Sequence, residues 1–551
     1  MAATRALTAE EMGRQQKEIS VSEFFAKNRH LLGFDNPRKA LLTAIKEAVD
    51  NSLDACEEAG IAPDLRVEVQ QLAEDRFRIA VEDNGPGIVK DQIPRIFGQL
   101  LYGSKFHRLR QARGQQGIGI SAAGMYGQMT TGKGLRIVSK TRKGPAHRME
   151  IHMDLTKNRP ITAVDSDQVQ EWNKPQGTRV EIELEGTYQK GPRSVDDYLK
   201  QTAVANPHCR IEYVTPEGET RLFERATTQL PRPSTEIRPH PYGVELGQLI
   251  KMLHDTRSRT LSGFLQEEFC RVGSKVADEI IRAAKLGERS YPTRIAREEA
   301  DQLYRAIQQV KISAPPTDCI SPIGEERILE GLKKEVDAEF YAVSTRPPAV
   351  YRGNPFQIEV GIAWGKPGGP ELELEEATGR ILARRKKKPA ADSDELLAAA
   401  DEPVRLLRFA NRVPLLYQQS ACAVTKAVIG VSWRNYGLAQ PRGALPVGPA
   451  LLLVHMASVW VPFTSESKEA IAGYPEILRE LRLGLMDAGR KLGAYVRKGR
   501  RIASEYQKRG YIDKYLPHVG IGLQEILGLS SDQRDEAVEK LRGVMEKSRS
   551  V

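Results

Sequence analysis

The chain has 551 residues, and its 82 Lys and Arg against 72 Asp and Glu leave a formal charge of +10. With 40% hydrophobic and 28% charged residues it is too apolar for wholesale disorder, and its length corresponds to about three to four domains. The most apolar run, residues 447–461, is shorter than the roughly 18 to 20 apolar residues of a membrane span, and residues 1–20 do not read as a signal or transit peptide. We therefore expect a cytoplasmic protein.

The first two parts of the chain differ in their periodicity. Residues 1–228 alternate amphipathic helical stretches with β-rich runs, which predicts a mixed α/β layer domain with strands at 65–70, 76–82, 135–139 and 178–184. Residues 229–312 begin with several prolines and then turn wholly helical from 244 to about 310. Three glycines predict the boundaries between four short helices there, namely Gly263, Gly273 and Gly287.

The second half returns to α/β patterns. Residues 313–510 are expected to form one domain, with strands at 338–351, 355–364 and 451–461, a helix from 467 and a long helix from about 476 to 508. A low-complexity stretch at about 384–403 interrupts it and predicts a flexible exposed loop. Residues 511–551 are expected to form a charged helical tail.

The helix predicted over residues 41–55 carries an acid and an amide on one face. At about 100° per residue, Glu47, Asn51 and Asp54 lie together, opposite an apolar face formed by Leu42, Ile45, Val49, Leu53 and Cys56. A carboxylate can accept a proton from water, and an amide oxygen can ligate a hard cation such as Mg²⁺. Taken alone, the pattern is more typical of a solvated helix face, so its meaning depends on a phosphate site nearby.

A second acid follows a predicted strand directly. Asp83 comes after the run 76–82 and begins a tight turn that contains Gly85 and Gly87. A carboxylate held at a strand end can accept a hydrogen bond from the exocyclic amine of a base, and the glycines let the backbone approach the ring. An Asp-Asn-Gly turn stabilised by its own side chains is the alternative interpretation.

The strongest local signal is the glycine-rich run at residues 113–124, RGQQGIGISAAG. Closely spaced glycines expose successive N–H groups, and the helix N-terminus that follows adds positive potential, which together suit a polyphosphate. The run lacks the Gly-Lys-Ser/Thr of a Walker A loop and the dinucleotide fingerprint, so another nucleotide fold is indicated. Ser104 and Lys105 supply a hydroxyl and an ammonium just upstream. A glycine loop without a ligand is the alternative.

These motifs together resemble the GHKL (Bergerat) ATPase superfamily of gyrase, heat-shock chaperones, MutL and histidine kinases. The shared features are E-x-x-x-N-x-x-D-A at 47–55, D-x-G-x-G at 83–87, the glycine lid through Gly119, and Gly177-Thr178 before a strand. Residues 102–107 and 113–124 are more narrowly similar to B subunits of type IIB DNA topoisomerases (topoisomerase VI), a likeness that runs over essentially the whole chain. The resemblance implies an α+β multidomain fold: a GHKL ATPase α/β sandwich, a helix-two-turn-helix insert, and a ribosomal-protein-like α/β transducer ending in a long helix.

The resemblance also implies residue roles in binding ATP and Mg²⁺. Glu47 would be the general base, Asn51 the Mg²⁺ ligand and Asp83 the reader of the adenine amine, with Thr178 in support. The remaining nucleotide-binding residues would be Asp54, Gly85, Gly87, Ser104, Lys105, Gly114, Gln115, Gln116, Gly117, Ile118, Gly119 and Ile120. Lys468 occupies the place from which related transducers send a lysine to the γ-phosphate, although S-x-S-K by itself is typical of an ordinary helix N-cap.

Three clusters are implied to contact double-stranded DNA. Ser274 and Lys275 begin a helix of the insert, where a phosphate could bind, although a plain structural insert is the alternative. The other two clusters are Trp433, Arg434 and Tyr436, where the family usually reads W-K-x-Y, and Lys498, Arg500 and Arg501 at the end of the long helix. A solvated helix face is the alternative for the last cluster, and the basic run 384–388 is expected to be a solvated loop.

The resulting hypothesis is an ATP-operated clamp, cytoplasmic and nucleoid-associated, that dimerises through its ATPase domains. DNA cleavage requires a tyrosine grouped with acidic metal ligands, a pattern not apparent in the sequence, so cleavage is expected on a separate A subunit in a heterotetramer of two A and two B subunits. The long helix and residues 511–551 are the expected docking elements for that subunit. A MutL-like or chaperone-like clamp, a nucleotide-free DNA-binding scaffold and a histidine kinase are the competing interpretations.

Overall fold

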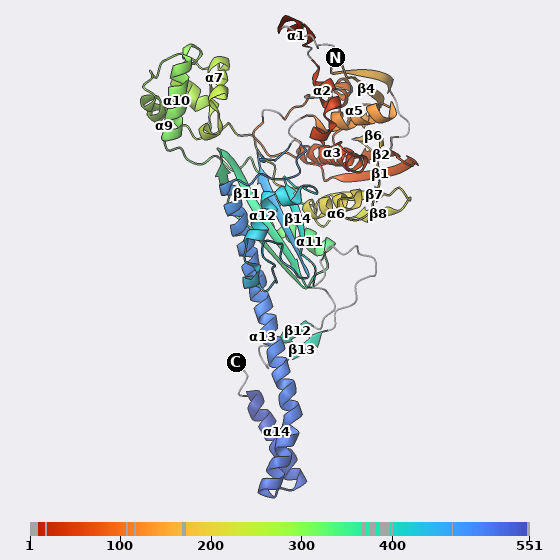
Figure 1. Cartoon of the computed structure of the whole chain (residues 1–551), viewed down its shortest axis with the longest axis vertical. Helices are drawn as coiled ribbons and strands as arrows, with labels where there is room; N and C mark the ends of the chain where they lie inside the picture. Colours follow the sequence, from red (N-terminus) through yellow and green to blue (C-terminus); the bar gives the residue numbers. More distant parts are fainter. Residues whose placement is uncertain are drawn as a thin grey trace, which may run out of the picture.

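The computed structural model describes residues 9–16, 19–105, 108–114, 117–167, 172–365, 371–374, 381–384, 397, 401–465 and 467–547. Figure 1 shows two sheet-based bodies, a helical module to one side, and a long helix that projects away from them. Within the part of the chain that is described, none of the helices combines the length and the apolar character that crossing a bilayer requires.

The first body is built on an eight-stranded sheet with the order β5-β4-β3-β6-β2-β1-β7-β8. Only β1 and β7 pair in parallel, and the other neighbours are antiparallel. Burial alternates along β3 and β6, so one face of the sheet carries the core. The strands are β1 (Asp64–Ala73), β2 (Arg76–Glu82), β3 (Leu135–Lys140), β4 (Ala146–Asp154), β5 (Arg159–Asp167), β6 (Gly177–Glu185), β7 (Arg210–Val214) and β8 (Thr220–Phe223).

Three helices cover that face, α3 (Pro37–Glu58), α5 (Gly119–Thr131) and α6 (Val195–Ala205). The Asn36 side chain accepts from the Lys39 amide at 2.9 Å and caps α3, whose first residue is a proline. Leu41, Ile45 and Leu53 are fully buried on the sheet side of α3. Shorter helices at this end are α1 (Ala9–Gln15), α2 (Val21–Lys27) and α4 (Ile93–Gly98).

The predicted four-helix module is confirmed as four consecutive helices with a core of their own. Phe264, Leu265 and Leu303 are fully buried within it, and the module stands apart from the first sheet (Figure 1). Its helices are α7 (Leu246–Asp255), α8 (Leu261–Glu268), α9 (Ser274–Ala283) and α10 (Arg297–Gln309).

The second body is built on a six-stranded sheet with the order β10-β11-β16-β14-β15 and β9 paired to β11. All nine residues of β16 are buried, because helices α12 and α13 cover one face and α11 covers the other. Its elements are α11 (Glu325–Glu335), β9 (Phe340–Thr345), β10 (Ala349–Tyr351), β11 (Asn354–Trp364), β14 (Arg405–Ala410), β15 (Val413–Pro414), α12 (Ala423–Gly430) and β16 (Ala450–Ser458).

A hairpin, β12 (Glu371–Leu374) with β13 (Ile381–Arg384), forms a separate small sheet. Most of the predicted flexible loop at 384–403 lies outside the described residues. The two bodies meet where α11 packs against α6, with Val204 and Ala205 of α6 in the same apolar cluster as Leu332 of α11. The second body is therefore fastened to the first by buried contacts.

The long helix α13 (Pro475–Leu527) has 53 residues and extends for about 80 Å. It begins where the sequence predicted but continues past 508, and α14 (Ser531–Lys547) folds back on its far end after Gly528, which caps the helix with φ 63°. The predicted helix from 467 is wrong. Residues 467–474 contain no helix, and the bridge between Phe463 and Ile471 closes a loop there instead.

Candidate nucleotide site between the two bodies

A cavity of about 540 Å³ is lined by α3 along its length and by the start of α5. Its walls contain most of the first-body residues that the sequence analysis predicted for the nucleotide site. They also contain Lys468 from the second body. Those lining residues are Glu47, Asn51, Asp83, Gly87, Ser104, Lys105, Gly114, Gly117, Ile118, Gly119, Ile120, Thr178 and Lys468. Gln115 and Gln116 lie outside the described residues.

At one end of the cavity, the Asp83 carboxylate is buried and held by three donors. Oδ1 accepts from the Gly85 and Thr178 amides at 2.9 and 3.0 Å, and Oδ2 accepts from the Ser52 hydroxyl at 2.9 Å. Burial raises the pKa of Asp83, against the lowering effect of these donors. A carboxylate can accept further hydrogen bonds beyond these three, so Asp83 is suited to an amine donor inside the cavity.

Gly85 therefore supports Asp83 rather than lining the cavity, whereas Gly87 lies on the wall. Gly87 adopts φ 73°, and a Cβ there would lie 2.1 Å from the Lys140 carbonyl oxygen. Both features require glycine at this turn. The Thr178 hydroxyl shares a 2.9 Å hydrogen bond with Ser139, which fixes its position beside Asp83.

The start of α5 lines the cavity, and no side chain caps the helix at Ile118. Uncapped N–H groups and the helix dipole make such a terminus suited to a phosphate. Glu47 of α3 lies directly against it: a Cβ built on Gly119 would stand 1.8 Å from the Glu47 carboxylate oxygen Oε2. The absence of a side chain at Gly119 thus allows the Glu47 carboxylate to lie directly against the start of α5.

Replacing Gly119 with alanine is expected to displace the Glu47 carboxylate. The rate of the ATP hydrolysis that the GHKL resemblance implies should then fall by roughly 10- to 100-fold, since small misplacements of reacting groups carry costs of that order. The fold should persist, because the clashing atom is the far end of a flexible side chain. Steady-state phosphate release and thermal unfolding measure the two effects, with Gly247→Ala, at an open position on α7, as the control. Hydrolysis at the wild-type rate in Gly119→Ala would argue against any role for Glu47 at its present position.

Asp54 does not line the cavity, which corrects the expectation that it contacts a nucleotide. It is buried, and its carboxylate pairs with Lys105 Nζ at 2.7 Å and with Arg113 Nη1 at 2.9 Å. Burial would raise the pKa of Asp54, but Lys105 and Arg113 hold it below its ordinary value. Asp54 thereby holds Lys105 and Arg113, which stand beside the lining residues Ser104 and Gly114, while Lys105 also pairs with Glu58 at 3.2 Å.

Lys468 reaches the cavity from the loop that was predicted as a helix start. The residue adopts φ 53°, and its Nζ donates to the Arg113 carbonyl at 3.4 Å. Burial lowers the pKa of the Lys468 ammonium, against the attraction of the nearby Glu47. The neighbouring Glu469 pairs with Lys39 of α3 at 2.5 Å, which ties this loop to the first body.

Comparisons with known proteins match both bodies. Residues 36–187 match the family described as histidine kinase-, DNA gyrase B-, and HSP90-like ATPase, and residues 315–508 match the transducer of the topoisomerase VI B subunit. The chain is 47% identical to the B subunit of type 2 DNA topoisomerase 6 from Methanosarcina barkeri, over 97% of its own length and 81% of that protein. The chain belongs to this B-subunit family. It is also 45% identical to the Archaeoglobus fulgidus member (98% and 84% covered) and 36% identical to the Pyrococcus furiosus member (94% and 93%).

The structure contradicts one of the DNA contacts that the B-subunit resemblance implied, the one at Trp433. Its side chain is fully buried in the second body, and its indole N–H donates to the Val428 carbonyl at 2.8 Å, so it cannot touch a DNA duplex. Tyr436 is half-buried and lies against Gly489 of α13, and Arg434 is exposed but donates to the Gln440 carbonyl at 2.7 Å. Trp433 is therefore a packing residue of this topoisomerase VI family member.

The other two clusters remain predictions. Ser274 and Lys275 are exposed at the start of α9, which no side chain caps. Lys498, Arg500 and Arg501 are exposed along α13. These positions are open to a polyanion, and a phosphate contact there would weaken with salt.

Sequence reasoning missed several residues that shape the site. Ser52 holds Asp83, and Lys39 holds the Lys468 loop through Glu469. Neither has a local pattern that distinguishes it from an ordinary helix residue. Residues 414–417, from the end of β15 into the segment before α12, complete the cavity wall from the second body. Arg113, which directly precedes the glycine loop, was visible in the sequence without a role.

Proposed function

We propose that this chain binds and hydrolyses ATP in the cavity and is the ATPase subunit of a type IIB DNA topoisomerase. The observation that carries the proposal is the convergence, in one cavity, of Asp83, Glu47 and the uncapped start of α5 with Lys468 from the second body. An adenine reader, a base, a phosphate cradle and a cation are the groups that ATP hydrolysis requires. The family membership supports the same conclusion.

In this proposal adenine lies at the Asp83 end, with its exocyclic amine donating to the carboxylate and Thr178 in support. The triphosphate extends toward the start of α5, where the amides of residues 117–120, the loop around Gly114, and Ser104 with Lys105 surround it. The Lys105 ammonium would then exchange part of its pairing with Asp54 and Glu58 for a phosphate.

A magnesium ion would be held by Asn51 together with the phosphates. Asn51 is exposed to the cavity and lies one helical turn from Glu47, and an amide oxygen suits this cation. The ion supplies charge neutralisation on the phosphates when bound. Glu47 accepts the proton of the attacking water, and the Lys468 ammonium approaches the γ-phosphate from the second body, so that the two bodies close on ATP.

The wider assembly is part of the same proposal. ATP binding would dimerise two first bodies into a gate around double-stranded DNA, and an A subunit would cleave the duplex in a heterotetramer of two A and two B subunits. The exposed clusters on α9 and α13 would contact DNA phosphates, and α13 with α14 would dock the A subunit. We place domains at 1–228, 229–312, 313–510 and 511–551, in a protein that works in the cytoplasm on the nucleoid.

The test is relaxation of supercoiled plasmid by the chain purified from its host with the proteins that accompany it. Relaxation is expected only with ATP and Mg²⁺, and only in fractions that contain a second, tyrosine-bearing subunit. The non-hydrolysable analogue AMPPNP should not sustain repeated relaxation. ATP hydrolysis without relaxation, in fractions that do contain a second, tyrosine-bearing subunit, would overturn the topoisomerase assignment and favour a MutL-like or chaperone-like clamp.

A further inference from the structure

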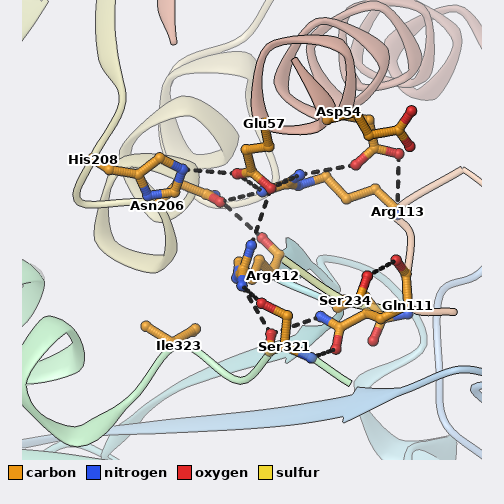
Figure 2. A network of polar contacts seen from close by, with 12 residues as sticks. Asp54, Glu57, Gln111, Arg113, Asn206, His208, Ser234, Ser321, Ile323 and Arg412 are labelled. Carbon is orange, nitrogen blue, oxygen red and sulfur yellow. Dashed lines mark hydrogen bonds and ion pairs between the residues drawn. The ribbon is translucent and has the colours of Figure 1, made fainter. Parts of the chain in front are cut away.

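A polar network joins the two bodies (Figure 2), and Glu57, in the last turn of α3, lies at its centre. Its carboxylate pairs with Arg113 at 2.7 and 2.9 Å, with His208 Nε2 at 2.7 Å and with Arg412 Nη1 at 3.1 Å. Two guanidiniums, one from each body, thus share a single, largely buried carboxylate. Removing one partner from such a group of paired charges is strongly destabilising, because it leaves an uncompensated charge behind.

On the side of the first body, Arg113 makes two further contacts. Its guanidinium also binds the Asp54 carboxylate at 2.9 Å and the Asn206 side-chain oxygen at 2.6 Å. Arg113 directly precedes Gly114, so it forms the base of the glycine loop that lines the cavity. Moving the base of that loop would break these charged contacts.

On the side of the second body, Arg412 lies in the two-residue turn between β14 and β15. Both turn residues, Asn411 and Arg412, adopt positive φ (49° and 68°), which is unusual for an arginine. The Arg412 amide donates to His455 Nε2 at 3.0 Å, and His455 Nδ1 donates to Glu359 at 2.7 Å, which fixes the neutral ring and its tautomer. The sheet strands β16 and β11 therefore hold the Arg412 turn.

The segment 111–113 is held by the second body as well. The Gln111 amide donates to the Cys319 carbonyl at 2.8 Å, and its side chain exchanges two hydrogen bonds with the Ser321 backbone at 2.6 and 3.0 Å. The Asn411 side chain donates to the Ala112 carbonyl at 3.1 Å. Arg412 binds the same serine that Gln111 binds: its Nη2 donates to the Ser321 hydroxyl and carbonyl oxygens, at 2.6 and 2.8 Å.

We propose that Arg412 is a positioning residue that ties the glycine loop to the second body, so that nucleotide binding and the docking of the two bodies stabilise one another. The proposal rests on the ATP site proposed above and adds a second connection to that of Lys468. The effect is reciprocal by thermodynamic linkage: if bound ATP stabilises the docked position of the Arg412 turn, that docked position raises the affinity for ATP by the same factor. Couplings of this kind are worth about 5- to 150-fold in affinity.

The test uses the full chain and the variant Arg412→Met, which removes the charge but leaves Glu57 paired with Arg113 and His208. Amide hydrogen exchange is measured at residues 108–114, 319–324 and 411–413, with and without AMPPNP. In the wild type the analogue should slow exchange in all three segments. In Arg412→Met the first segment should still be protected, protection of the other two should be lost, and the Kd for AMPPNP should rise about 10-fold.

Arg346→Met is the matched control, because Arg346 makes a comparable pair of contacts with Glu480 and Asp487 that lies wholly within the second body. It should retain the wild-type response. Protection of 319–324 that survives in Arg412→Met, or is lost equally in Arg346→Met, would overturn the proposal. If Arg412→Met does not fold, Arg412→Gln, which also removes the charge and leaves Glu57 paired with Arg113 and His208, is held to the same outcomes. A wild type that binds no AMPPNP would instead refute the ATP site itself.

Discussion

Replacing Glu47 with glutamine is expected to abolish ATP hydrolysis while ATP continues to bind. Glutamine keeps the shape of the side chain against Gly119 but cannot accept the proton of the attacking water. A general base contributes about 10²- to 10⁴-fold to a rate, so kcat should fall by that factor. The Kd for ATP should stay within about 3-fold, since the α5 terminus and Asp83 are untouched. Phosphate release and equilibrium nucleotide binding measure the two quantities.

The control is Glu330→Gln, which alters an exposed glutamate on α11 and should leave both quantities unchanged. If Glu47→Gln hydrolysed ATP at the wild-type rate, the base would have to be another group. If ATP binding were lost together with hydrolysis, Glu47 would be holding the nucleotide or its magnesium ion rather than activating water.

Replacing Asp83 with asparagine is expected to remove the preference for adenine. The carboxylate receives hydrogen bonds from Ser52, Gly85 and Thr178, and an amide group would place a donor where one of its two acceptor oxygens lies. A buried donor left without an acceptor costs about 1–3 kcal/mol, which corresponds to about 5- to 150-fold in ATP affinity. Kd values for ATP and for inosine triphosphate, which lacks the exocyclic amine, measure the preference directly.

The wild type should bind ATP more tightly than inosine triphosphate, and Asp83→Asn should bind both weakly and about equally. Asp255→Asn, at an exposed position of α7, should behave as the wild type does. A wild type that does not distinguish the two nucleotides would show that Asp83 does not read the amine, whatever the variant does.

The features that the sequence predicted correctly are those with a local cause. Apolar residues at helical spacing placed α3 and set Glu47 and Asn51 on one of its faces, because the period of a helix is a property of the backbone. Glycine and proline marked the Asp83 turn, the start of α5 and the four helices of the module. The family motifs then assigned the fold, and the matches to both bodies confirmed it.

The features that the sequence alone did not predict depend on contacts between distant residues. Trp433 was predicted to contact DNA, but packing against the second sheet buries it. The Lys468 segment was predicted to start a helix, but it forms a loop that is held by the Glu469–Lys39 ion pair and the Phe463–Ile471 bridge. Arg412 and Glu57 are separated by 355 positions in the chain, so no local pattern relates them. The sequence by itself determined the helices, the strand runs and the types of residue available to ATP. Only the tertiary structure decided which charges pair. A buried ion pair forms where two packed bodies exclude water, and the positions of its residues in the sequence do not reveal that contact.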